Sequence, residues 1–143
     1  MKVAWKFVEG ITVADVAFEA TGKTLEEVFA DSAQALTATM VKDVKAIKPK
    51  VAKKLELKAG TAEQLLHDFL EELVFRKDAD LLLFGRTEVK LDEGGKSLKA
   101  VLFGEKLNPE RHELLVDVKA VTWHGFSLEK VKDGWKATAV LDV

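Results

Sequence analysis

The chain has 143 residues and a formal net charge of −2, and 48% of its residues are hydrophobic. These values predict one globular domain over residues 1–143, with one sizeable core. The nearly balanced charge argues against a protein that binds nucleic acid strongly by neutralising phosphates. Since cysteine is absent, disulfides and thiolate metal sites are excluded. No signal peptide or apolar run of membrane-spanning length is present, so we expect a cytoplasmic protein without membrane contact.

The first third of the chain predicts two strands and a helix. Alternating apolar residues predict strands over Lys2–Val8 and Ala14–Thr21. A capping box then begins a helix that runs to about Met40. In this box Thr24 is expected to bond the amide of Glu27, while the Glu27 carboxylate returns to the amide of Thr24.

The next segment, Ile47–Ala59, is extended and basic, with lysines at positions 50, 53, 54 and 58. A phosphate-binding patch would explain these lysines, but an edge strand protected by charge explains them better. A second capping box, with Thr61 and Gln64, predicts a helix to about Lys77. His67 lies near the start of this helix, and we interpret it as a boundary residue rather than a ligand.

Strands dominate the remainder of the chain. They are predicted at Leu81–Leu91, Ser97–Phe103, His112–Gly125, Phe126–Val131 and Trp135–Val143. Runs of neighbouring strands favour antiparallel pairing. The expected fold is therefore α+β, with one mixed, mainly antiparallel sheet and two helices packed on one face.

The strand predicted at His112–Gly125 contains one unusual residue, Lys119. Alternation would place Val118 on one face and Lys119 with Val121 on the other. A lysine among apolar neighbours either needs an anionic partner or lies along the sheet with its ammonium in water. The sequence leaves both interpretations open.

Standard catalytic motifs are missing from the sequence. It has no glycine-rich phosphate loop, nucleophile elbow or metalloprotease helix. The three histidines, His67, His112 and His124, have no recognised ligand spacing. We therefore expect a protein that is not an enzyme.

Three carboxylates nevertheless could converge: Asp15, Asp142 and the terminal carboxylate of Val143. If their strands are neighbours, the three charges would repel unless a cation lies between them. Oxygen ligands of this kind suit Ca²⁺ or Mg²⁺, and Lys119 could supply a further counter-charge. The alternative is that both Asp residues are solvated strand ends in unrelated places.

Several dispersed motifs together resemble the archease family, whose members assist the tRNA-splicing RNA ligase. Ala14-Asp15 matches the end of the family's His-Thr-Ala-Asp motif, and Leu141-Asp142-Val143 matches its carboxyl-terminal tripeptide. The other matching segments are Asn108–His112, Lys119–His124, Leu65–Leu73 and Asp133–Ala137. Thr12 and Val13 depart from the family, which usually has His and Thr there.

The resemblance implies a non-catalytic activator that promotes guanylylation and multiple turnover of a ligase in tRNA splicing. This ligase joins 3′-phosphate or 2′,3′-cyclic-phosphate ends to 5′-hydroxyl RNA. The resemblance also implies a divalent cation held by Asp15, Asp142 and Val143, expected to be Ca²⁺, with Mg²⁺ or Mn²⁺ as alternatives, and a role in partner activation for Lys119. The runner-up is a chaperone-like module for RNA-modifying enzymes such as tRNA methyltransferases. A metal-dependent hydrolase is a third interpretation, although no general base is evident.

Overall fold

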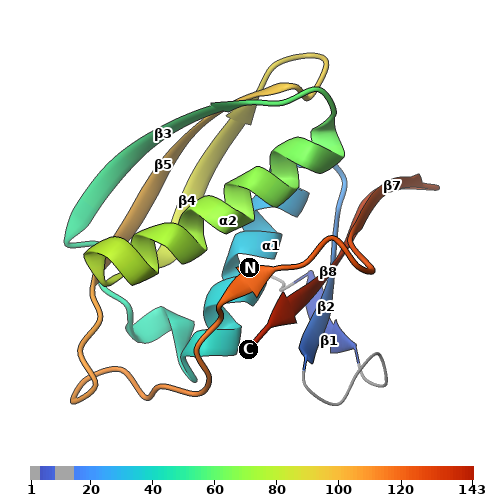
Figure 1. The fold of residues 1–143 in the computed structure, drawn as a ribbon. Helices are drawn as coiled ribbons and strands as arrows, with labels where there is room; N and C mark the ends of the chain where they lie inside the picture. The colour runs from blue at the N-terminus through green and yellow to red at the C-terminus, as the bar shows by residue number, and fades with distance from the viewer. Residues whose placement is uncertain (1–3, 9–14) are drawn as a thin grey trace.

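The computed structural model describes residues 4–8 and 15–143 of the chain, and Figure 1 shows its elements. Its helices are α1 (Leu25–Met40), the short 3₁₀ helix η1 (Val44–Ala46) and α2 (Ala62–Asp80). Its strands are β1 (Trp5–Val8), β2 (Asp15–Gly22), β3 (Val51–Lys58), β4 (Leu82–Leu91), β5 (Ser97–Lys106), β6 (Ala120–Val121), β7 (Ser127–Val131) and β8 (Gly134–Asp142).

The strands form two antiparallel sheets rather than the one sheet predicted. Three strands pair in the order β3-β5-β4, whereas β1-β2-β8-β6 forms the second sheet, in which β7 also pairs with β8. The α+β class and the antiparallel pairing are confirmed, but the single sheet is wrong. The reason is that β4 and β5 form a long hairpin whose free side pairs with β3, while β8 returns to β2.

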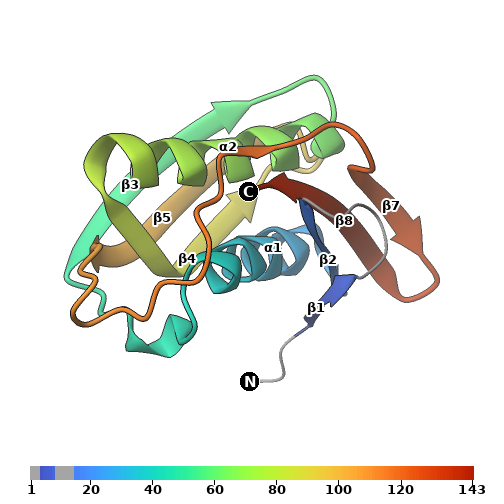
Figure 2. The same cartoon turned by 60° about the horizontal axis from the view of Figure 1, so that its bottom comes forward.

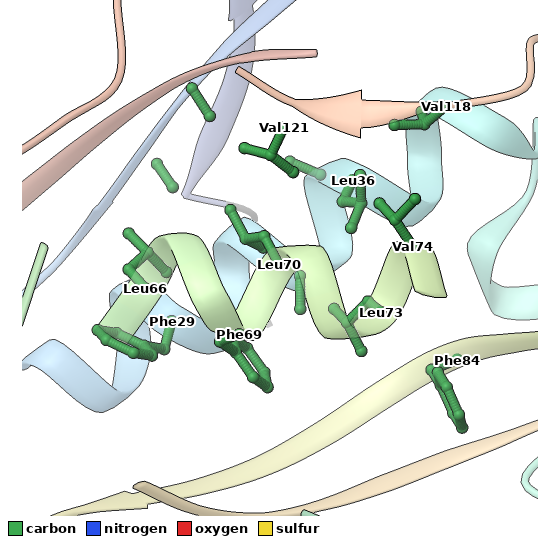
Figure 3. Packing of buried hydrophobic residues seen from close by; sticks show 14 of the residues in the cluster. Phe29, Leu36, Leu66, Phe69, Leu70, Leu73, Val74, Phe84, Val118 and Val121 are labelled. Atoms are coloured by element: carbon green, nitrogen blue, oxygen red, sulfur yellow. The ribbon is translucent and has the colours of Figure 1, made fainter. Parts of the chain in front are cut away.

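Both long helices contact strands of both sheets. In Figure 1 the helices occupy the middle of the molecule, with the three-stranded sheet on one side and β2 and β8 on the other. Figure 3 shows how α2 contributes to this arrangement, since Leu66, Leu70 and Val74 point toward the segment that carries Val118 and Val121. The buried apolar residues of both sheets and both helices form one continuous cluster.

Each long helix begins at the predicted capping residue. Thr24 accepts a hydrogen bond from the Glu27 amide at 3.2 Å, and Thr61 accepts one from the Gln64 amide at 3.1 Å. The Glu27 carboxylate accepts from the Lys23 amide at 2.8 Å. The Glu27 carboxylate therefore bonds the amide of the residue before Thr24, and not the amide of Thr24 itself as predicted.

The strand predicted at His112–Gly125 is wrong over most of its length, because only Ala120–Val121 pairs as a strand. The residues before it bond elsewhere: the Glu113 carbonyl accepts from the Lys42 amide, and the Leu115 amide donates to the Met40 carbonyl. This part of the chain is therefore tied to the end of α1 instead of a sheet. The predicted alternation also fails, since Val118 and Val121 are both buried.

The basic strand β3 lies at one edge of its sheet and pairs on one side with β5. Lys53, Lys54 and Lys58 are exposed there, as expected for a strand edge protected by charge. Among the described residues, neither α1 nor α2 is long and apolar enough to cross a lipid bilayer.

Candidate cation and docking site

The two aspartates identified from the sequence lie directly opposite each other. Strands β2 and β8 pair antiparallel in a register that matches Asp15 with Asp142 and Val16 with Leu141. The predicted proximity of the two strands is thus confirmed. Because directly opposed residues have Cβ atoms about 4.5–5.5 Å apart, the two carboxylates can reach a common ion.

Lys119, another predicted residue, lies just before β6 and at the same level of the sheet. Ala120 pairs with Asp142, and the Lys119 amide donates to the Asp142 carbonyl at 2.8 Å. Lys119 and Asp142 are exposed, whereas Asp15 and Val143 are half-buried. An exposed Lys119 agrees with the second interpretation of this residue, in which the ammonium reaches water. We call Asp15, Lys119, Asp142 and Val143 the carboxylate rim.

The donor chemistry of the carboxylate rim fits a hard divalent cation. Two opposed carboxylates repel each other in the absence of a counter-charge, and Ca²⁺ or Mg²⁺ takes oxygen ligands together with water. Within residues 4–8 and 15–143, no three His, Cys, Asp or Glu side chains gather as a metal-binding group. Beside Asp15 and Asp142, the predicted third ligand is the terminal carboxylate of Val143, and water completes the shell of such ions. The cation site stays a prediction.

Polar side chains of α2 hold the segment that carries Lys119. The Glu71 carboxylate accepts from the Val121 amide, and His67 Nε2 donates to the Val121 carbonyl at 2.8 Å. Because His67 and Glu71 are four residues apart, they lie on one face of α2. Together they bond both the amide and the carbonyl of Val121. The same face continues at Glu63, whose carboxylate accepts from the Leu128 amide at 3.0 Å.

Lys77 completes this row of contacts at the carboxyl end of α2. It is buried, and its ammonium donates to the Val118 carbonyl at 2.8 Å and forms ion pairs with Asp78 and Asp117. Burial alone would lower the pKa of Lys77, but the hydrogen bonds to Asp117 and Asp78 raise it above its ordinary value. Lys77 is therefore a charged anchor for the chain just before Lys119.

A buried ion cluster fixes the other end of the same segment. Glu105 on β5 accepts hydrogen bonds from Arg111 and from the Lys48 amide, the latter at 2.7 Å. His112 Nε2 lies 2.9 Å from the Glu105 carboxylate, while Nδ1 accepts from the Asn108 amide at 2.9 Å. The predicted Asn108–His112 motif thus has a structural role, because it ties the loop to β5.

An open cleft of about 910 Å³ lies at the opposite end of β2 and β8, away from the carboxylate rim. It is bordered by Gly22, Glu27, Asp31 and Trp135. Burial, together with the nearby Glu27 charge, raises the pKa of Asp31. The cleft therefore does not include any of the residues predicted to hold a cation.

Comparison with known proteins agrees with the resemblance seen in the sequence. The model of the "Archease protein family (MTH1598/TM1083)" matches residues 5–143. The chain belongs to the archease family. "Protein archease" of Thermococcus kodakarensis is 42% identical over 133 residues, which cover 91% of this chain and 93% of that protein. "Protein archease" of Methanopyrus kandleri is 36% identical, over 97% and 99% of the two chains.

Solved structures extend the comparison to the archease fold. The solution structure of Methanobacterium thermoautotrophicum protein 1598 has a TM-score of 0.85 and 32% identity, and the match covers 99% of this chain and 100% of that one. The crystal structure described as "an archease, possible chaperone" from Thermotoga maritima has a TM-score of 0.64 and 19% identity, with coverage of 95% and 97%. The second comparison shows the shared fold alone.

Within this archease fold, sequence reasoning placed the rim residues but missed the residues of α2 that support them. His67, interpreted as a boundary residue, is buried and bonded to Val121. The spacing of Glu63, His67 and Glu71 by four residues was the available signal, since it marks a polar row along one helix face. The departure from the archease motif at Thr12 and Val13 lies outside the described residues.

Proposed function

We propose that this archease is a non-catalytic accessory protein that activates the tRNA-splicing RNA ligase. The supporting observation is the register that sets Asp15 opposite Asp142, with Lys119 just before the adjacent strand β6 and bonded through its amide to Asp142. Strands β2 and β8 supply two carboxylates, and the residue before β6 supplies one ammonium. Such an arrangement can present a bound cation to a partner without itself completing a catalytic site.

In the proposed mechanism, the cation-loaded carboxylate rim docks against the basic, metal-containing active site of the ligase. The rim would bind most tightly to the ligase state in which metal and nucleotide are arranged for guanylylation. An activator needs this difference in affinity, because a ligand that binds two states equally shifts no equilibrium. Lys119 would contact an anionic group of that state, and its backbone bond to Asp142 fixes its place beside the carboxylates.

Asp15, Asp142 and the terminal carboxylate of Val143 would hold the cation, which we propose to be Ca²⁺. Bound there, the cation would offset the repulsion among the carboxylates and supply positive charge at the docking surface. Titration of the protein with Ca²⁺, Mg²⁺ and Mn²⁺ by calorimetry tests this assignment directly. Saturable Ca²⁺ binding that disappears in Asp142→Asn supports it, whereas binding of none of the three ions contradicts it.

The decisive experiment measures RNA joining by a cognate ligase present far below the substrate concentration. We expect this protein to raise the product beyond one equivalent per ligase. Asp15→Asn and Asp142→Asn should abolish the stimulation, since each removes one charge from the cation site. Asp133→Asn is the matched control, because it lies in the turn before β8, at the far end of the same strand. Full stimulation by both rim variants would contradict the mechanism.

A second candidate function is a chaperone-like module for RNA-modifying enzymes such as tRNA methyltransferases. One observation favours it: Leu114, Leu115 and Val116 are exposed in succession next to the end of α1. Exposed apolar patches commonly mark protein-binding surfaces. Suppression of methyltransferase aggregation in the absence of ligase would support this function, and loss of that effect in Leu115→Ser would locate it. The cytoplasm, where a protein without disulfides is stable, is the proposed compartment for either function.

A further inference from the structure

A second feature of the same edge is an exposed tryptophan held in a fixed position. Trp123 lies two residues after the end of β6, and it is 55% exposed. Its ring lies parallel to that of His67, with centroids 3.7 Å apart and 9° between the planes. Phe126 packs edge-on against both rings, with centroid distances of 5.0 Å to His67 and 5.5 Å to Trp123.

Burial and a hydrogen bond position His67 in this stack. His67 is only 6% exposed, and its Nε2 donates to the Val121 carbonyl at 2.8 Å. One face of Trp123 is therefore covered by a ring with its own anchor, while more than half of the residue remains open to solvent. An aromatic ring ordered in advance loses little conformational entropy when a partner packs on it.

Helix α2 carries a second exposed aromatic residue, Phe75, which is 60% exposed. Phe75 follows His67 by eight residues, or about 12 Å along a helix. Glu71, Glu72 and Asp78 lie three or four residues from Phe75 on the same helix face. Each has a partner within the protein, namely the Val121 amide, Arg76 and Lys77 respectively. Residues 62–80 hold six acidic residues and two basic ones, which gives this helix a formal charge of −4.

From this arrangement we infer that Trp123 and Phe75 are the apolar anchors of a docking surface for a basic face of a protein partner. Aromatic residues with an apolar body are the usual anchors of protein interfaces. The formal charge of −4 on α2 favours a basic partner and disfavours RNA, whose phosphates this helix would repel. We call Trp123, Phe75 and the acidic residues beside Phe75 the aromatic–acidic surface.

The Trp123 end of the aromatic–acidic surface lies close to the carboxylate rim. Strand β6 and Thr122 separate Trp123 from Lys119 along the chain, and β6 pairs with β8 while it contacts α2. Figure 2 shows this segment passing beside α2 before it enters β7. This inference rests on the proposed function, since it assigns the ligase as the basic partner. The rim would then select the active state of the ligase, while the aromatic–acidic surface would provide affinity.

The test separates affinity from maximal stimulation in the RNA-joining assay with cognate ligase. Trp123→Ala and Phe75→Ala should each raise the concentration needed for half-maximal stimulation by about tenfold or more. The maximum reached at saturation should remain that of the unaltered protein, because the carboxylate rim is untouched. Phe7→Ala is the matched control, since Phe7 is an exposed aromatic residue on β1 at the other edge of its sheet. It should leave the half-maximal concentration unchanged.

Direct binding distinguishes failure of this inference from failure of the proposed function. Immobilised ligase should bind the unaltered protein, and both aromatic variants should bind about tenfold more weakly at low salt, with circular dichroism confirming that they are folded. Unchanged affinity of folded Phe75→Ala and Trp123→Ala, alongside normal stimulation, would overturn the inference and leave the proposed function intact. Tight binding of single-stranded RNA that both variants lose would also overturn it. If the unaltered protein binds ligase through these aromatic residues but does not stimulate it, the docking surface stands and the activator function falls.

Discussion

The three-stranded sheet and the segment 107–128 satisfy their backbone groups in different ways. In the sheet, β5 pairs along its length with β3 on one side and β4 on the other, so backbone bonds to backbone. In the segment, the carbonyl of Val118, both backbone groups of Val121 and the amide of Leu128 bond instead to side chains of α2. The sheet should therefore tolerate most single changes of its exposed polar side chains, whereas the segment depends on a few particular ones, on α2 and at the buried Glu105 of β5.

The largest expected effect comes from Glu105, the buried carboxylate of β5 that holds the start of this segment through Arg111 and His112. Glu105→Ala leaves Arg111 and the Lys48 amide without their buried acceptor, and we expect a loss of about 3–5 kcal/mol of unfolding free energy. Urea denaturation measures the loss. The control is Glu88→Ala on β4, which removes an exposed ion pair to Arg86 and should cost less than about 1 kcal/mol. Similar losses for the two variants would contradict the contrast between the regions.

The three-stranded sheet should be sensitive where its backbones approach closely. A Cβ at Gly104 would lie 1.8 Å from the Leu83 carbonyl oxygen, so Gly104→Ala forces β4 and β5 apart. We expect a cost of about 1–3 kcal/mol, measured as a lower melting temperature. Gly94→Ala in the hairpin turn, where the nearest atom is 4.0 Å away, is the control. A Gly104 variant as stable as the Gly94 variant would show that the sheet absorbs the added methyl group.

A smaller and more local effect is expected at Val121. Glu71→Leu removes the acceptor of the Val121 amide, and an unsatisfied buried amide costs about 1–3 kcal/mol. Hydrogen exchange at this amide should accelerate about tenfold or more, while amides of β5 keep their rates. Glu71→Gln retains an acceptor oxygen and should exchange more slowly than Glu71→Leu. Glu72→Leu is the control, because the carboxylate it removes bonds Arg76 and not Val121. If the Val121 amide exchanged as fast in Glu72→Leu as in Glu71→Leu, a specific role of Glu71 would be refuted.

The smallest effect concerns pH. Burial, with the nearby charges of Arg111 and Lys50, lowers the pKa of His112 below its ordinary value. Between these two pKa values the unfolded chain binds a proton at His112 that the folded protein does not. The stability contributed by neutral His112 is therefore fully present above about pH 6.5 and is lost as the pH falls through the folded pKa. Unfolding free energies between pH 7 and pH 5 should fall more steeply for the unaltered protein than for His112→Gln; parallel slopes would contradict this.

The same contrast explains how far the sequence could predict the fold. Strands β4 and β5 were predicted because hydrophobic alternation and a glycine-containing turn encode their pairing locally. Both long helices were found from their capping residues for the same reason. The division into two sheets depends on which distant strands meet, and local periodicity carries no information about that choice.

The site was predicted in its residues more completely than in its geometry. Asp15 and Asp142 were identified because polar residues at the ends of apolar strands stand out. The segment around Lys119 was wrongly predicted as a long strand, because β-branched residues such as Val116 and Val118 favour that interpretation. In fact its partners are side chains of α2, more than forty residues earlier in the chain, and no pattern within the segment indicates them.

Helix α2 also limits how other chains can approach. The outer edge of β6 and β7 would ordinarily offer free amides and carbonyls to an extended peptide. The amide and carbonyl of Val121 are already bonded to Glu71 and His67, and the amide of Leu128 is bonded to Glu63. A partner strand therefore cannot pair with these groups in the way that many peptide-binding domains allow. Recognition at Val121 must instead use side chains, and the bonds from α2 leave less of this edge open to edge-to-edge aggregation.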